Sequence, residues 1–173
     1  VLEIIKKDFG SMEKGGMSAP DIKADSPPTE IREKIDTKED KAQTHILLGF
    51  LGPTLMDEDH YAIEVLNTIM SGMGGRLFLE LRDKKSLAYT VTSFYTPGLE
   101  PGFLGVYIGT APQKEQEAIQ GMKEQLELLL KDGVTDEEIE RAQNYLVGSF
   151  EIGLQQSSSQ AAKITFDELY GIG

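Results

Sequence analysis

The sequence feature that most constrains the fold is a pair of stretches with a two-residue period, separated by a short turn. Leu87–Tyr95 and Phe103–Thr110 alternate in the manner of strands, and Pro97–Gly102 between them is typical of a hairpin. We therefore predict two antiparallel neighbouring strands. A third alternating run, Gln43–Gly52, is apolar on both faces, which predicts a strand buried within the sheet.

Helical periodicity occupies the segments around these strands. Carboxylates at Asp57–Asp59 suit the first turn of a helix, and Leu77–Lys85 has the pattern of a short second helix. Pro112 suits the start of a long helix, and Thr135–Glu138 matches a capping box that starts another. The polar run Gln155–Gln160 is expected to interrupt the last helical stretch. Strands interleaved with helices predict an α+β fold, in which helices cover one face of a largely antiparallel sheet.

The ends of the chain differ from its middle. Residues 1–10 have helical spacing and end at a glycine, which indicates the C-terminal helix tail of a preceding domain. Residues 11–42 are rich in Gly, Pro, Ser and charged residues, as in a linker. Residues 43–173 form the expected main domain. Because no closing strand follows its last helix, we expect a domain truncated at its C-terminus.

Composition excludes several function classes. The formal charge of −12 repels phosphate backbones, so nucleic acid is not an expected partner. No run approaches the roughly 18 apolar residues of a membrane span, so no membrane partner is expected. The chain has no cysteine and two histidines, His45 and His60, too few for a His-rich zinc site. The lack of cysteine does not fix the compartment, because exported bacterial proteins can also lack it.

Two strong hydrogen-bond donors lie near the predicted corner between the short helix and the following strand. Arg82 lies next to the apolar face of that helix, and Tyr89 begins the strand. A guanidinium and a neutral phenol could hold peptide carbonyl oxygens or stabilise a forming oxyanion. The alternative is that Arg82 is a solvated or ion-paired surface group and Tyr89 an ordinary strand residue.

Other candidate sites have simpler explanations. Gly72, Gly74 and Gly75 lack the Lys-Ser/Thr of a phosphate loop and follow a helix, so a turn between two helices accounts for them. His60 has acidic neighbours, but its surroundings do not form a zinc-binding motif, and His45 lies on a separate strand. We therefore predict no metal ligands in this chain.

Four ordered blocks of the sequence resemble the second homologous half of M16 zinc peptidases, the family of insulinase and mitochondrial processing peptidase. The blocks are Gln43–Phe50 (QTHILLGF), His60–Asn67 (HYAIEVLN), Gly74–Tyr89 (GGRLFLELRDKKSLAY) and Gly133–Leu146 (GVTDEEIERAQNYL). The chain departs from the full family pattern because it lacks the His-x-x-Glu-His zinc motif.

The resemblance implies a clamshell enzyme of two similar α+β halves that enclose a chamber. Zinc is then expected in the N-terminal half of the intact enzyme or in a partner subunit, with none in this chain. Arg82 and Tyr89 occupy the family positions whose donors orient the substrate and stabilise the tetrahedral intermediate. Gly74 and Gly75 lie where non-catalytic processing-peptidase subunits carry a longer substrate-handling loop, so they are further substrate-binding candidates.

These expectations define the substrate-binding half of a zinc metalloendopeptidase that is inactive alone. Its expected partners are a peptide substrate and the half-domain or subunit that bears the zinc motif, and a dimer is a further possibility. Two alternatives stay open. One is a non-catalytic subunit that acts in peptide binding or assembly, and the other is an unrelated α+β regulatory domain.

Overall fold

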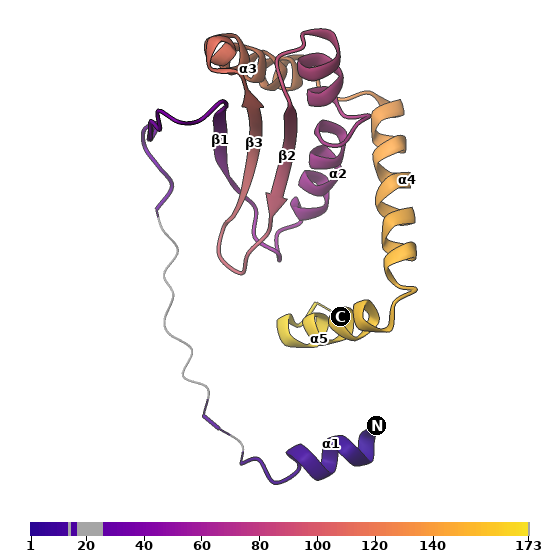
Figure 1. Ribbon diagram of the computed structural model, residues 1–173. Coiled ribbons are helices and arrows are strands. Elements are labelled where there is room, and N and C mark those ends of the chain that lie inside the picture. Colours follow the sequence, from indigo (N-terminus) through magenta and orange to yellow (C-terminus); the bar gives the residue numbers. More distant parts are fainter. Residues whose placement is uncertain (14, 17–25, 173) are drawn as a thin grey trace.

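Three strands form one antiparallel sheet in the computed structural model of the chain, which describes residues 1–13, 15–16 and 26–172 (Figure 1). They are β1 (Thr44–Gly52), β2 (Thr90–Thr96) and β3 (Gly102–Thr110), in the order β1-β3-β2. Strands β2 and β3 form the predicted hairpin, with Val91 opposite Ile108. The predicted antiparallel pairing is therefore confirmed.

Helices lie against one face of this sheet (Figure 1). Those that contact the strands are α2 (His60–Met70), the π-helix η1 (Phe78–Lys84) and α3 (Glu115–Asp132), which follows the 3₁₀ turn η2 (Pro112–Lys114). Helix α4 (Asp136–Gly153) comes next in the chain, and α5 (Ser157–Tyr170) lies below the sheet in Figure 1, away from its face. Helices α2 and η1 contact β2, α3 contacts β3, and α4 packs against α2. The predicted α+β architecture is confirmed. A break between the last two helices is present but spans only residues 154–156, because residues 157–160 of the predicted interruption form the first turn of α5.

The hydrophobic core lies between the sheet and these helices. Its buried members come from α2, η1 and its flanks, β2, β3 and α3: Met70, Leu77, Leu81, Leu87, Val91, Val106, Ile108, Ala118 and Met122. Leu77 and Leu81 are fully buried, so the apolar side of η1 is fixed against the sheet. Each such leucine contributes about 1.5–3 kcal/mol through burial.

Strand β1 is an edge strand, and the prediction of burial on both faces was wrong. Ile46 and Leu48 pack against the core, whereas Leu47 and Leu51 on the opposite face are more than half exposed. We call this opposite side of the sheet the open face; it carries His45, Leu47, Leu51, Phe94, Phe103 and Tyr107. Alternation of apolar residues shows that both sides of a strand can be covered, but it does not show what covers them.

Two element boundaries also differ from expectation. Asp57–Asp59 precede α2 rather than forming its first turn, because the Asp57 carboxylate accepts a hydrogen bond from the Thr54 N–H at 2.6 Å and so closes a tight turn. Strand β2 begins at Thr90 rather than Leu87. The residues before it end η1, with Ser86 in the left-handed region (φ 50°) and the Leu87 N–H bonded to the Leu81 carbonyl at 2.8 Å.

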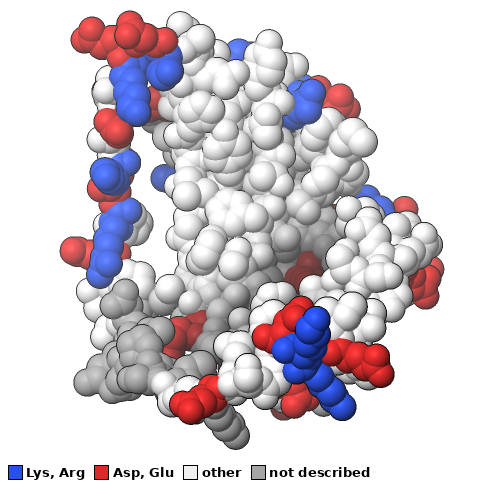
Figure 2. All heavy atoms as spheres, turned by 60° about the horizontal axis from the view of Figure 1, so that its bottom comes forward, with Lys and Arg blue, Asp and Glu red and all other residues white. Residues whose placement is uncertain are grey.

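The N-terminal part of the chain lies apart from this core (Figure 1). Helix α1 (Leu2–Phe9) buries no side chain, and residues 26–43 are almost entirely exposed and contain neither helix nor strand. Part of the predicted linker, residues 14 and 17–25, falls outside the described residues. In Figure 2 charged side chains gather along the strip at the left of the view, where residues 26–43 run. In the described part of the chain, no helix is long and apolar enough to cross a bilayer.

Candidate functional site

The candidate site begins at the glycine turn between α2 and η1. Gly72 has φ 74°, a conformation that side chains rarely adopt. A Cβ on Gly75 would stand 2.0 Å from the Ser71 carbonyl oxygen, so only glycine fits there. Gly74 is exposed and has open space around its Cβ position. The turn thus has a structural reason at Gly72 and Gly75, and the substrate-binding role of Gly74 and Gly75 stays a prediction.

Arg82 projects from η1 with its guanidinium held on an aromatic ring. Its Cζ lies 4.8 Å from the centroid of Phe78 on the same helix. The neighbouring Glu80 carboxylate accepts a hydrogen bond from Lys84 at 2.5 Å. Within the described residues, the Arg82 side chain makes no hydrogen bond or salt bridge, and it is exposed. The contact with the Phe78 ring thus restrains an exposed guanidinium that keeps several N–H donors for a ligand.

Tyr89 lies immediately before β2 and presents its phenol to solvent. The side chain is 76% exposed, and its hydroxyl has no partner among the residues that the structure describes. Its backbone is fixed, because the Tyr89 N–H donates to the Gly109 carbonyl at 2.9 Å. Tyr89 therefore combines a held main chain with an available O–H donor.

The corner between these two residues is tied to the elements beside it. Lys114 Nζ donates to the Ser86 carbonyl at 2.8 Å, and the buried Thr110 hydroxyl donates to the Leu87 carbonyl at 2.5 Å. Lys85 forms a salt bridge with Glu124 of α3 at 2.7 Å. Among the described residues, no hydrogen bond joins Arg82 to Tyr89. They flank a corner of the chain that β3 and η2 hold through its backbone carbonyls and that α3 holds through the Lys85 side chain.

A second arginine near the site, Arg76, was not singled out by sequence reasoning. Its Nε and Nη2 donate to the two carboxylate oxygens of Glu138 at 2.5 and 2.6 Å, and Nη2 also donates to the Gly133 carbonyl at 2.9 Å. Glu138 is the capping-box residue of α4, so the predicted box is confirmed and has this additional partner. The hydrogen bonds from Arg76, more than those from Thr135, lower the pKa of Glu138 to about 2.

The two histidines are each bound to a tyrosine. Buried His60 lies with Nδ1 3.2 Å from the Tyr95 hydroxyl, which donates to the Pro53 carbonyl at 3.1 Å. Burial, with smaller contributions from nearby carboxylates, raises the pKa of Tyr95. On the open face, His45 Nδ1 lies 2.7 Å from the Tyr107 hydroxyl. These histidines belong to separate networks.

Side chains that could bind zinc do not cluster in the part of the chain that the structure describes. In the described ranges, no three side chains of His, Cys, Asp or Glu lie close enough together to hold a metal ion. The residues present therefore do not fit the zinc ion that M16 peptidases use. The chemistry available at the Arg82–Tyr89 corner is hydrogen-bond donation to an oxygen-rich ligand.

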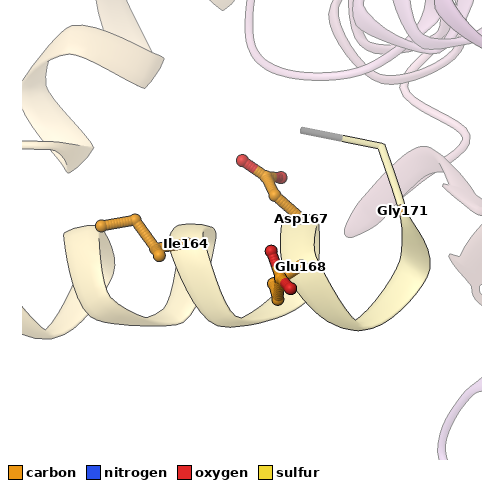
Figure 3. A pocket seen from close by; sticks show the side chains of 4 residues that line it. All are labelled: Ile164, Asp167, Glu168 and Gly171. Atoms are coloured by element: carbon orange, nitrogen blue, oxygen red, sulfur yellow. The ribbon is translucent and has the colours of Figure 1, made fainter.

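A shallow pocket elsewhere is formed by α5 and its C-cap alone. Ile164, Asp167, Glu168 and Gly171 line it (Figure 3). Asp167 already pairs with Lys163, and Ile164 is largely exposed. The pocket includes neither Arg82 nor Tyr89, so we do not assign it to the candidate site.

Comparison with known proteins gives consistent matches. The family model described as the peptidase M16 inactive domain matches residues 1–146. The uncharacterized zinc protease YmxG of Bacillus subtilis is 32% identical over 166 residues, which is 95% of this chain and 40% of that protein. The chain thus spans about two fifths of the length of this relative.

Solved structures show the same fold. The peptidase M16 inactive domain from Pseudomonas fluorescens is 31% identical, with a TM-score of 0.60 over 63% of this chain and 27% of that chain. A protease from Helicobacter pylori, 21% identical, superimposes with a TM-score of 0.83 over 98% of this chain and 42% of that chain.

Proposed function

Because this chain belongs to the family of peptidase M16 inactive domains, we propose that it is the substrate-binding half of a zinc metalloendopeptidase. Several relatives carry the name of uncharacterized zinc proteases, which supports a role in proteolysis. In this proposal the domain is inactive alone and faces a half-domain with the His-x-x-Glu-His motif, in the same polypeptide or in a partner subunit. The two halves enclose a chamber in which a peptide is cleaved.

The proposal rests mainly on Arg82 and Tyr89, whose donor groups are held in place and exposed. Arg82 is oriented by Phe78 yet keeps its N–H groups available, and the Tyr89 hydroxyl is exposed on a fixed backbone. Other basic groups on the same segment are engaged by carboxylates or carbonyls, as Arg76, Lys84 and Lys85 are. Donors that are held in place, and that have no partner among the described residues, suit a ligand supplied from outside the domain.

The proposed chemistry follows from these groups. Arg82 offers a fork of donors to peptide carbonyl oxygens, and Tyr89 offers a single O–H. Both interactions strengthen as a carbonyl oxygen gains negative charge during attack by water. Zinc, bound in the other half, would supply activation of that water. This chain then contributes orientation of the peptide and stabilisation of the oxyanion.

The test is peptide cleavage by the intact enzyme that contains this domain and its zinc-binding half. Arg82→Ala and Tyr89→Phe should each lower kcat/KM by on the order of 10²-fold, since each removes a transition-state donor. Matched controls are Arg141→Ala and Tyr145→Phe on α4, which remove an exposed arginine and an exposed phenol elsewhere. The controls should retain the wild-type rate.

Two results would contradict this proposal. If Arg82→Ala and Tyr89→Phe cleave as fast as the wild type, the assignment of these donors is wrong. If the intact assembly binds peptide but does not cleave it with zinc present, the domain acts instead as a peptide-handling subunit.

A further inference from the structure

We infer that Arg76 and Glu138 are positioning residues for Arg82: their paired side chains lock the start of η1 onto α4 and so fix the aromatic platform on which the Arg82 guanidinium rests. This inference rests on the proposed function, because it assigns a role in the same site. It adds two residues that lie 62 positions apart in the sequence.

The ion pair between Arg76 and Glu138 is bidentate and partly buried. Both Arg76 nitrogens that face Glu138 donate, each to a different carboxylate oxygen, and Nη2 also reaches the Gly133 carbonyl. This fork geometry fixes the guanidinium in a plane, which a single point charge cannot do. The two side chains are 19% and 17% exposed, so solvent screens them less than it screens the Lys85–Glu124 pair, whose side chains are each 40% exposed.

The Arg76–Glu138 pair anchors the start of η1. Arg76 follows the glycine turn, and the fully buried Leu77 comes next, so two adjacent side chains anchor the entry to η1 in different directions. Phe78 is the first residue of η1 and is the ring beneath Arg82. A change in the direction of the entry therefore moves the ring, and the ring carries the guanidinium with it.

On the α4 side of the pair, the Glu138 carboxylate is itself held in place. Glu138 is held in turn by Thr135, whose N–H donates to Oε2 at 2.9 Å and whose Oγ1 accepts from the Glu138 N–H at 3.3 Å. The carboxylate is therefore fixed to the first turn of α4 before it meets Arg76. Helix α2, which precedes the glycine turn, packs on α4. The Arg76–Glu138 pair also attaches the start of η1, which follows the turn, to α4, so both ends of the turn are fixed to the same helix.

The test is a double-mutant cycle between Arg76 and Arg82, measured as peptide cleavage by the intact enzyme. Arg76→Gln should lower kcat about tenfold with little change in KM, because a small displacement of a transition-state donor lowers the rate of the chemical step. In the Arg82→Ala background the same substitution should change kcat less than twofold. Glu138→Gln should behave as Arg76→Gln does.

A merely structural role would give a different result. If Arg76→Gln lowers kcat by the same factor in both backgrounds, it acts on the fold and the inference is overturned; a wild-type kcat for Arg76→Gln overturns it as well. If Arg82→Ala alone is silent, the proposed function fails first, and the two failures are thereby distinguished. Should Arg76→Gln not fold, Arg76→Lys, which keeps the charge but not the fork, enters the same cycle. The control is Lys163→Gln, which breaks the ion pair with Asp167 in α5 and should leave kcat unchanged.

Discussion

A size exchange between Leu81 and Gly121 tests how η1 is seated on α3. A Cβ added at Gly121 would lie 2.8 Å from Leu81 Cδ2 and 3.4 Å from Leu87 Cδ1. Because Leu81 is fully buried, its methyl group has little room to move away. The side chain of Leu81 thus occupies the space that a residue larger than glycine would need at position 121.

The expected energies follow from this contact. Leu81→Ala should destabilise the domain by about 3 kcal/mol, through lost burial and the cavity left behind. Gly121→Ala gains about 1 kcal/mol in helix propensity, which overpacking of about 1–3 kcal/mol offsets in the wild type. In the Leu81→Ala background the new methyl fills the cavity, adding about 0.8 kcal/mol to the propensity gain. The substitution should therefore be stabilising by about 2 kcal/mol there.

The assay is hydrogen exchange of the β3 amides at increasing urea concentration, since these amides report opening of this domain's core. The control is Gly148→Ala in α4, where a Cβ meets nothing within 4 Å, so its gain should be the same in both backgrounds. Equal effects of Gly121→Ala with and without Leu81 would refute the reasoning, because they would show that the two positions do not share space.

Three further predictions concern other contacts. The pKa of Glu138 is lowered from 4.5 to about 2, so its pairing with Arg76 stabilises the fold fully above pH 4.5 and is lost as the pH falls through about 2; Glu138→Gln should give a shallower fall in melting temperature between pH 5 and pH 2. At Ser86 (φ 50°), valine should destabilise by roughly 1–3 kcal/mol and glycine should not, as measured by melting temperature. Thr110→Val removes the hydrogen bond to the Leu87 carbonyl and should cost about 1–3 kcal/mol in urea denaturation, whereas no loss would show that the carbonyl finds another donor.

The fold was largely predictable because local signals and tertiary packing agree. The hairpin turn at Pro97–Gly102 and the capping box at Thr135–Glu138 both form where the sequence predicts them. These features depend on residues close together in the chain. The break between α4 and α5 is also held locally, since the Gln160 side-chain amide donates to the Leu154 carbonyl at 2.7 Å.

Features that depend on distant residues were not predictable in the same way. The Arg76–Glu138 pair joins a glycine turn to a helix start, and neither segment alone indicates the other. A signal was present, because a capping glutamate with a second free oxygen can accept a further donor, but many arginines could supply it. For the site, sequence and resemblance supplied Arg82 and Tyr89. The contact between Phe78 and Arg82 was not predicted, although their four-residue spacing in a predicted helix was a signal for it.

The free edge of β1 affects how two copies of this chain approach each other in solution. Within the described residues β1 pairs only with β3, so its other edge offers free N–H and C=O groups beside the exposed Leu47 and Leu51. Two copies that approach each other along this edge each carry a formal charge of −12. At 0.1 M salt that repulsion extends over about 10 Å, and at 1 M it falls to about 3 Å. The acidic composition of the chain therefore acts as a colloidal barrier against sheet extension between copies, and salt lowers that barrier.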